Sequence, residues 1–322
     1  MLKTLRRLSR RSARALGEWL ISAAGPASPT EVTLRGMSSR QEAIFAYLYQ
    51  RTHTHYHSMA VPVGENTVLA LLHARLMIYL DTRGRDLAPH VMMFGIWEPP
   101  YTQLFQRLIR PGDTVFDIGA HHGVYTLLGA VATGHGGKVH AFEPNPRYAE
   151  LLDRSIAVNG FGGICQLHPV AVGAAEGQTE LHFSFEYGGG GHLALAGYPL
   201  RGEKQGSACR VVALDDLFPD PATTVDVMKM DVEGTETNAV RGMRGLLARS
   251  PRARVMFEFA PQLLTAHGGG PAALIEEFRT LGFRFWSIEE QGGIRPADEA
   301  ELAARRTGLA NILAAREDPF AG

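Results

Sequence analysis

The chain lacks the features that mark several classes of protein. It has only two cysteines, Cys165 and Cys209, in no CxxC pair and in no metal-ligand spacing. This predicts buried free thiols and a reducing, cytoplasmic location rather than a disulfide framework. No apolar run is long enough to cross a membrane. The net charge of −1 gives no overall attraction to nucleic acid, so we expect no nucleic-acid partner.

Two common phosphate-binding turns are also missing. No Gly-Lys-Ser or Gly-Lys-Thr follows a glycine-rich loop, which excludes a Walker motif. The most glycine-marked strand end does not read G-x-G-x-x-G, and the bulky His121 and His122 stand where a pyrophosphate would need room. An NAD-dependent oxidoreductase is therefore a less favoured interpretation of this strand end.

A different glycine turn is present. The β-rich run Thr114–Ile118 is followed by glycines in the pattern D-x-G-x-x-x-G, formed by Asp117, Gly119 and Gly123. The pattern predicts a buried parallel strand that turns into a helix over about Val124–Ala132. Glycine permits the backbone angles of a tight turn and the close approach of a ligand. S-adenosylmethionine, with its amino group and ribose, suits such a turn; a purely structural turn is the alternative.

A second acid follows the next predicted strand. Lys138–Phe142 is apolar and alternating, and Glu143 and Pro144 close it. Glu143 lies 24 residues after Gly119, near the offset of about 20 residues at which such folds place an acid on ribose hydroxyls. Because ligands bind beyond the carboxyl ends of parallel strands, the two strand ends predict one site.

A third strand, about Val225–Met230, also ends at an acid, Asp231. Lys229 and Asp231 share a face because residues two apart in a strand point the same way. Further strands and helices alternate along the chain and predict an α/β fold with a doubly wound, mostly parallel sheet. The other strands are expected over about 164–172, 179–185, 210–214, 254–259, 283–288 and 309–314, and the other helices over 101–109, 147–159 and 273–281.

Three parts are expected along the chain. Residues 1–36 form a basic arm and linker that could make weak contact with an anionic membrane surface, although a solvated arm is the simpler interpretation. Residues 37–110 form an extension packing on the core, with a helix near 40–50 and two short strands at 67–72 and 75–80. Residues 111–322 form the catalytic domain. The alternating histidines of 53–57 lack the acids or cysteines of a metal site.

Taken together, VFDIGAHHGVYT, HAFEPNP, LDDL and KMDVEGTE, in this order, resemble the FkbM-type methyltransferase family. The resemblance covers about residues 76–259. It implies a class I methyltransferase fold, S-adenosylmethionine as methyl donor, and a hydroxyl acceptor on a sugar, glycan or natural product. It also implies roles for individual residues: Asp117, Gly119 and Gly123 at the methionine end of the donor, Glu143 at its ribose, and Asp231 and Glu233 facing the transfer site. We add Ala120 to the expected donor-binding residues and His121 to the expected catalytic ones.

The resemblance leaves the proton acceptor open. An alcohol is a poor nucleophile until its proton is removed, so a base is expected near the donor. Asp231 is the first candidate, with His121, His122, Glu233 and Glu258 as alternatives. A Mg²⁺ ion held by Asp231 and a neighbouring acid could instead lower the pKa of the hydroxyl. Helix capping by Asp231 and a silent donor-binding scaffold protein are the non-catalytic alternatives. The sequence leaves the oligomeric state open.

Overall fold

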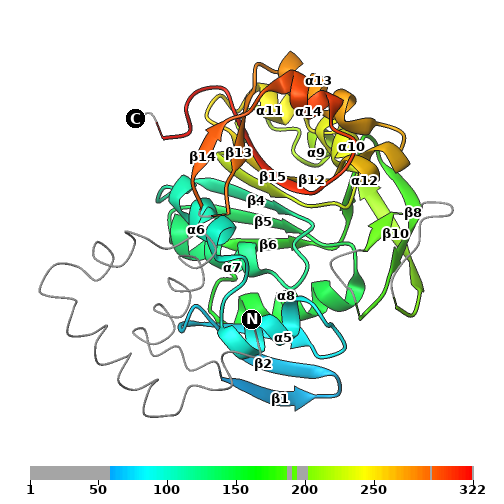
Figure 1. The fold of residues 1–322 in the computed structure, drawn as a ribbon. Helices are drawn as coiled ribbons and strands as arrows, with labels where there is room; N and C mark the ends of the chain where they lie inside the picture. The colour runs from blue at the N-terminus through cyan, green and yellow to red at the C-terminus, as the bar shows by residue number, and fades with distance from the viewer. Residues whose placement is uncertain (1–58, 187–190, 194–201, 291, 321–322) are drawn as a thin grey trace, which may run out of the picture. The chain divides into compact units, whose positions relative to one another are not determined.

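The computed structural model describes residues 59–186, 191–193, 202–290 and 292–320, all within one compact unit, Tyr56–Gly322 (Figure 1). The largest sheet has eight strands in the order β14-β13-β15-β12-β11-β4-β5-β6. These strands are β4 (Thr114–Ile118), β5 (Lys138–Phe142), β6 (Cys165–His168), β11 (Val227–Met230), β12 (Arg254–Phe259), β13 (Arg284–Ile288), β14 (Ile294–Pro296) and β15 (Ala310–Ala315).

The order of the strands confirms the predicted fold class. From β6 to β12 the sheet is parallel and follows the doubly wound order 3-2-1-4-5 along the chain. Beyond β12, strand β15 runs antiparallel to both β12 and β13. This is the mostly parallel sheet of class I methyltransferases. The strand order reverses between β4 and β11: β5 and β6 lie on one side of β4, and β11 and β12 lie on the other. A ligand crevice is therefore expected beyond the carboxyl ends of β4 and β11.

Helices cover both faces of this sheet because its central strands are apolar on both faces. Phe116 and Met228 pack in one cluster with residues of α10, α11 and α13, whereas Val115 and Val227 pack in another with residues of α6, α7 and α8. The helices are α5 (Leu87–Phe94), α6 (Pro99–Leu108), α7 (Val124–Thr133), α8 (Pro146–Val158), α9 (Leu214–Leu217), α10 (Glu236–Arg241), α11 (Arg244–Ala248), α12 (Pro261–Ala266), α13 (Gly270–Thr280) and α14 (Glu299–Ala304).

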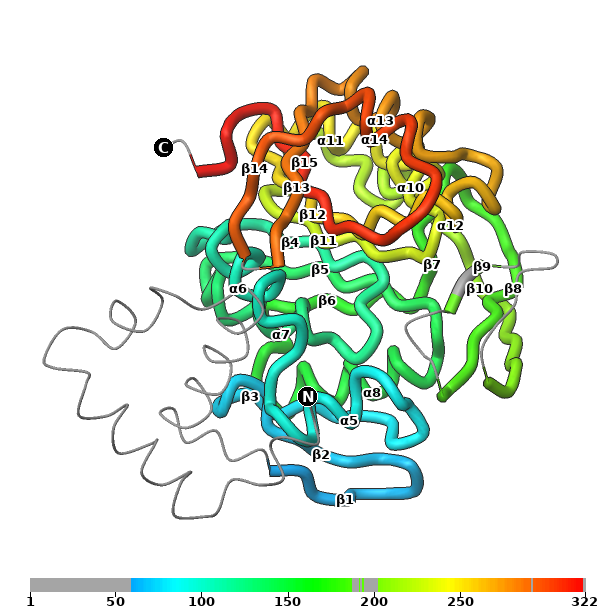
Figure 2. Tube along the Cα trace, in the orientation of Figure 1, coloured from blue at the N-terminus to red at the C-terminus, as the bar shows by residue number. Residues whose placement is uncertain are grey.

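A three-stranded antiparallel sheet precedes the catalytic core: β1 (Ala60–Gly64), β2 (Thr67–Leu72) and β3 (Leu76–Asp81). Figure 2 shows it on the same side of the molecule as α5 and α8. Side chains of α8 pair with the free edge of β3: Tyr79 N–H donates to Ser155 Oγ at 2.9 Å, and Met77 N–H donates to Asn159 Oδ1 at 2.9 Å. Because an unpaired strand edge would be exposed, these bonds fix the small sheet to the core.

The predicted third strand over 164–172 is wrong as a single element. It divides at Pro169: β6 joins the main sheet, whereas β7 (Ala171–Val172) joins β8 (Gly177–Phe183), β9 (His192–Leu193) and β10 (Gln205–Val212) in a second sheet. Proline has no N–H to donate, so a ladder is interrupted there. After Gly234 the chain forms two short helices, α10 and α11.

The other predicted elements are present within a few residues of their expected bounds, except that β10 is longer and β8 begins earlier. Helices α5, α9, α12 and α14 and strands β1, β9 and β14 were not predicted. The basic arm, the helix near 40–50, the histidines of 53–57 and most of the run Gly188–Gly191 lie outside the described residues. Among described residues, no helix has the length and apolar character needed to span a bilayer.

Candidate active site

A cavity of about 290 Å³ lies beyond the carboxyl ends of β4, β5 and β11, at the predicted switch point of the sheet. Its lining includes almost every residue that the sequence singled out. Asp117, Gly119, Ala120, His121 and Glu143 line it from β4, β5 and their turns, and Asp231, Glu233 and Glu258 line it from β11 and β12. Gly123 is not among the lining residues.

The two glycines of the turn are required by packing. Gly119 has a φ of 81°, and a Cβ on it would lie 1.9 Å from the backbone oxygen of Asp231. Gly123 has a φ of 88°, and a Cβ there would lie 2.2 Å from Leu152 Cδ1 of α8. Both positions therefore exclude other residues by backbone angle and by contact. The turn after β4 lies directly against the end of β11, so the two strand ends share one wall.

Two buried carboxylates stand at the β4 and β5 side. Asp117 accepts a hydrogen bond from Thr126 Oγ1 at 2.6 Å. Glu143 accepts one from the backbone N–H of His121 at 2.6 Å and another from that of Asn145 at 2.8 Å. Burial raises the pKa of Asp117 to about 6 and that of Glu143 to about 7, although these hydrogen bonds act in the opposite direction. Both groups are thus held in fixed orientations.

The two imidazole rings of His121 and His122 do not block the cavity. His122 is 2% exposed and points away to the small sheet, where its Nε2 lies 3.1 Å from the backbone nitrogen of Asp81. His121 lines the cavity, and its ring packs edge-on to that of Tyr148 at a centroid distance of 4.3 Å. Burial lowers the pKa of both imidazoles, so both are neutral near pH 7.

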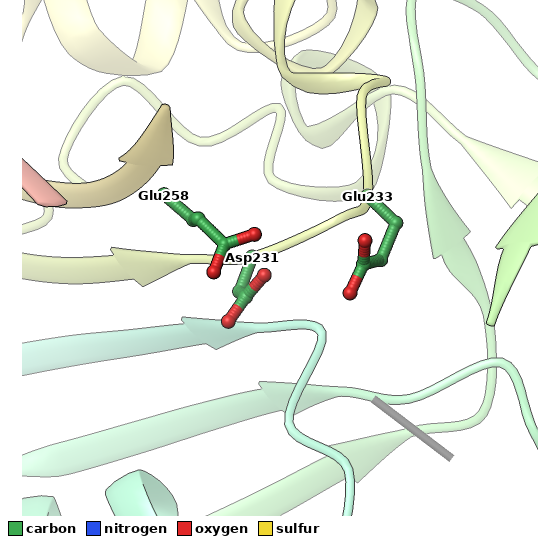
Figure 3. Close-up of side chains that lie close together, drawn as sticks. All are labelled: Asp231, Glu233 and Glu258. Atoms are coloured by element: carbon green, nitrogen blue, oxygen red, sulfur yellow. The ribbon is translucent and has the colours of Figure 1, made fainter. Parts of the chain in front are cut away.

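Three further carboxyl groups meet on the other side of the cavity. Oxygens of Asp231, Glu233 and Glu258 lie within 4.8 Å of one another. Figure 3 shows them pointing into a common space, Asp231 and Glu258 from the ends of neighbouring strands and Glu233 from the following loop. Burial, and then the charge of Asp231, raises the pKa of both glutamates. A cation or a shared proton would relieve this crowding.

Lys229 is the counter-ion of this group. Its ammonium donates to Asp231 Oδ2 at 3.0 Å and lies 5.2 Å from the ring centre of Tyr125. The lysine is 2% exposed, and the nearby carboxylates raise its pKa despite its burial. Lys229 and Asp231 thus point the same way, as the strand period predicted. Asp231 is not a helix cap, because α10 begins at Glu236 with Thr235 as its N-cap, and Glu236 accepts the N–H groups of Val232 and Gly234 in the turn.

The extension before the core also contributes to the cavity. Asp86, Leu87, Trp97 and Glu98 all line it. Glu98 stands at the N-terminus of α6 without capping it and instead accepts a hydrogen bond from the Tyr125 hydroxyl at 3.0 Å. Trp97 and Glu98 thus both belong to the wall of the cavity. Asp86 and Tyr148 were missed, because no strand end or glycine turn marks them.

An apolar wall completes the β5 side. Phe142, Val170, Ala171 and Val172 line the cavity there. None of these four residues is an acid. A flat apolar ring could lie against this wall, with its edge read by main-chain groups.

Comparison with known families decides what the cavity serves. The model of the FkbM methyltransferase domain matches residues 117–285, which is more than half of the chain. The chain belongs to the FkbM methyltransferase family. It is therefore an S-adenosylmethionine-dependent methyltransferase, and the oxidoreductase interpretation is wrong.

Individual relatives of this FkbM-family chain agree. It is 29% identical over 232 residues to 31-O-demethyl-FK506 methyltransferase FkbM from Streptomyces tacrolimicus, which covers 62% of this chain and 83% of the relative. Among solved structures, an S-adenosylmethionine-dependent O-methyltransferase from Thermotoga maritima is 12% identical, with a TM-score of 0.39 over 80% of this chain and 84% of its own. TomG from Streptomyces achromogenes is 15% identical, with a TM-score of 0.38 over 67% and 79%. Both scores are below 0.5, so the assignment rests on the family match.

The family match divides the site of this methyltransferase unequally. The matched residues 117–285 contain both strand-end acids, the glycine turn and the group formed by Asp231, Glu233 and Glu258. Trp97 and Glu98 lie before it. The cavity of this family member is thus completed by residues that its family model does not include.

Proposed function

We propose that the chain transfers the methyl group of S-adenosylmethionine to a hydroxyl on a sugar, glycan or other natural product. The observation that carries the proposal is the single cavity at the ends of β4, β5 and β11, with fixed carboxylates on one side and crowded ones on the other. A relative named for methylating 31-O-demethyl-FK506 supports an oxygen acceptor. The lining has seven carboxyl side chains and one lysine, which suits a cationic sulfonium.

In this proposal the β4 and β5 side binds the donor. Glu143 accepts hydrogen bonds from the ribose hydroxyls through the lone pairs that its two backbone contacts leave over. Asp117 and the main chain from Gly119 to Ala120 face the methionine half. The adenine lies against the apolar wall formed by Phe142 and Val170–Val172.

The other side activates the acceptor. The hydroxyl oxygen attacks the methyl carbon, the carbon–sulfur bond breaks, and S-adenosylhomocysteine leaves as the neutral sulfide. We assign the hydroxyl proton to Asp231, which ends β11 beside the donor turn. Lys229 holds that carboxylate in place. The reacting atoms must be held about 3 Å apart and in line, which the shared wall of the two strand ends favours.

A Mg²⁺ ion held by Asp231, Glu233 and Glu258 is the alternative route to an activated hydroxyl, and their close spacing favours it over a site elsewhere among the described residues. Titration of activity with EDTA and then with Mg²⁺ separates the two routes. Activity that EDTA abolishes and Mg²⁺ restores supports the metal; activity that EDTA does not change supports Asp231 acting alone.

Calorimetry with S-adenosylmethionine, followed by mass spectrometry of a hydroxylated extract incubated with labelled donor, tests the proposal. We expect binding that Glu143→Ala weakens by about 10-fold or more, because a buried hydrogen bond to a charged group is lost. We also expect a product that is heavier than its precursor by one CH₂ group plus the mass of the isotope label. Binding without any labelled product would favour a silent donor-binding scaffold instead.

A further inference from the structure

A chain of buried contacts runs from the small N-terminal sheet to the wall of the cavity. It begins at Asp81, the last residue of β3, which is 0% exposed. The backbone N–H of Asp81 meets Nε2 of His122 at 3.1 Å, and Nδ1 of His122 lies 3.2 Å from Nδ1 of His121. The chain ends at Nε2 of His121, which is buried and has no hydrogen-bond partner among the described residues.

The first contact fixes the proton of His122. A backbone N–H can only donate, so Nε2 of His122 must accept and carries no proton. An imidazolium has no acceptor nitrogen, so His122 is neutral. A neutral imidazole carries one proton, and that proton must be on Nδ1.

The second contact fixes the proton of His121. Nδ1–H of His122 points to Nδ1 of His121, so a proton on that nitrogen too would set two donors against each other. Nδ1 of His121 therefore accepts, and its single proton is on Nε2. Neither nitrogen of His121 then has a free lone pair with which to take a proton from an acceptor hydroxyl.

Asp81, at which this series of contacts begins, is held by two arginines. The Asp81 carboxylate accepts from Arg83 Nε at 2.8 Å and from Arg147 Nε at 2.9 Å. Arg147 belongs to α8, which also carries Tyr148 against the ring of His121. The position of Asp81, and with it the donor N–H that sets both imidazoles, is thus fixed to the core.

We propose that His121 is a donor-binding residue rather than a base, that its Nε2–H donates to an oxygen of the bound S-adenosyl ligand, and that Asp81 and His122 are positioning residues that place this proton. The proposal rests on the proposed function for the identity of the ligand. The oxygen belongs to the ribose or to the α-carboxylate, the two oxygen-bearing parts of that ligand.

The positions of the protons are testable without a ligand. Long-range ¹H–¹⁵N correlation spectra of the protein labelled in histidine, assigned with the variants at positions 121 and 122, report which ring nitrogen is protonated. We expect His121 and His122 as the Nε2–H and Nδ1–H tautomers. His122→Asn keeps an amide donor near the Nδ1 position, whereas His122→Gln keeps only an acceptor near the Nε2 position. His121 should keep its tautomer in the Asn variant and lose its preference in the Gln variant. A proton on Nδ1 of His121 in the unaltered protein would overturn the proposal.

The role of that proton is tested by ligand binding and kinetics. Glutamine places an amide N–H near the Nε2 position of histidine, and asparagine does not. We expect His121→Asn to raise the Kd for S-adenosylhomocysteine and the KM for the donor about 10-fold, with most of the loss recovered in His121→Gln. A base would instead lose 10²–10⁴ in kcat in both variants, which would refute the proposal.

The same measurement with 5′-methylthioadenosine, which lacks the amino-acid part, locates the oxygen. A loss shared by both ligands assigns it to the ribose, and a loss confined to S-adenosylhomocysteine assigns it to the carboxylate. If the unaltered protein binds neither ligand, the proposed function fails. The tautomer spectra still show whether the contacts through Asp81 and His122 place the proton of His121 on Nε2.

Discussion

The two sides of the cavity differ in how their carboxyl groups are satisfied. On the donor side, Asp117 and Glu143 are almost fully buried, and each accepts hydrogen bonds from the turn or from the first helix after it. On the acceptor side, Asp231 and Glu258 are partly exposed and crowd Glu233, with Lys229 bound to Asp231 alone. The carboxyl groups of the donor side thus have their hydrogen bonds before a ligand binds, whereas the acceptor side has negative charges that are still to be compensated.

The difference indicates a division of labour. A group that is already oriented by hydrogen bonds loses little freedom when its ligand arrives, which favours binding. Burial and the charge of Asp231 raise the pKa of Glu233 and Glu258, so this group is suited to take up a proton or a cation during the reaction. We therefore expect changes on the donor side to act mainly on affinity and changes on the acceptor side to act mainly on turnover.

Asp231→Asn should have the largest effect. If Asp231 takes the hydroxyl proton, kcat should fall by about 10²–10⁴, because an amide cannot accept it. The Kd for S-adenosylhomocysteine should change by less than about 3-fold, since the donor side keeps its own hydrogen bonds. Single-turnover kinetics and calorimetry measure the two. An equal loss in both quantities would erase the distinction between the two sides.

Gly119→Ala tests the wall that the sides share. Its Cβ would meet the Asp231 carbonyl oxygen at 1.9 Å, so we expect a loss of about 3 kcal/mol or more in the free energy of unfolding. Gly160→Ala is a matched control: its φ is 72°, and nothing lies within 4 Å of the added Cβ. It should cost only about 1–2 kcal/mol, the penalty of the backbone angle. Equal losses by denaturant unfolding would mean that the contact is unimportant.

The pH dependence of Glu143 gives a smaller effect. With a pKa of about 7 in the free protein, its ionised fraction rises between pH 6 and pH 8, and the affinity for S-adenosylhomocysteine should rise roughly 5- to 10-fold. Glu143→Gln should flatten this rise. Because the folded pKa is raised, the contribution of Glu143 to stability is present below about pH 4.5 and is lost through about pH 7. As the pH rises through that window, the melting temperature of the ligand-free protein should therefore fall more than that of the Glu143→Gln variant.

Glu258→Gln should have the smallest effect, and of opposite sign. Its carboxyl group is partly buried beside Asp231, and both circumstances raise its pKa to about 8. A neutral amide removes that repulsion from about pH 8 upward, where the carboxyl group ionises, so the ligand-free protein should melt about 2–4 °C higher for each kcal/mol gained. Differential scanning calorimetry at pH 8 measures this. A lower melting temperature would mean that the acceptor side is better compensated than its geometry implies.

Strand ends and glycine turns were the predictable part of this molecule. Strands β4, β5 and β12 have the bounds that the apolar runs predicted, and Asp117, Glu143 and Asp231 line one cavity because parallel strands end at one edge. The sequence explained Gly119 by the tight turn and the close approach of a ligand. The structure adds a further reason, because a side chain there would also meet the backbone carbonyl of Asp231.

What the sequence could not supply was contact across distant segments. Nothing near His122 in the chain indicates that its partner is Asp81, and no periodicity marks Tyr148 as a cavity residue. The break at Pro169 was signalled by the proline itself, but the run of apolar residues on both sides outweighed it. The residue-level roles assigned to the site remain predictions.

The attachment of β3 to α8 has a practical consequence. A shortened protein that began at the border of the family domain would expose the Ser155 and Asn159 side of α8 and would lose the walls that Trp97 and Glu98 supply. Anyone who grafts this catalytic unit onto another protein should carry the segment from about residue 59 with it.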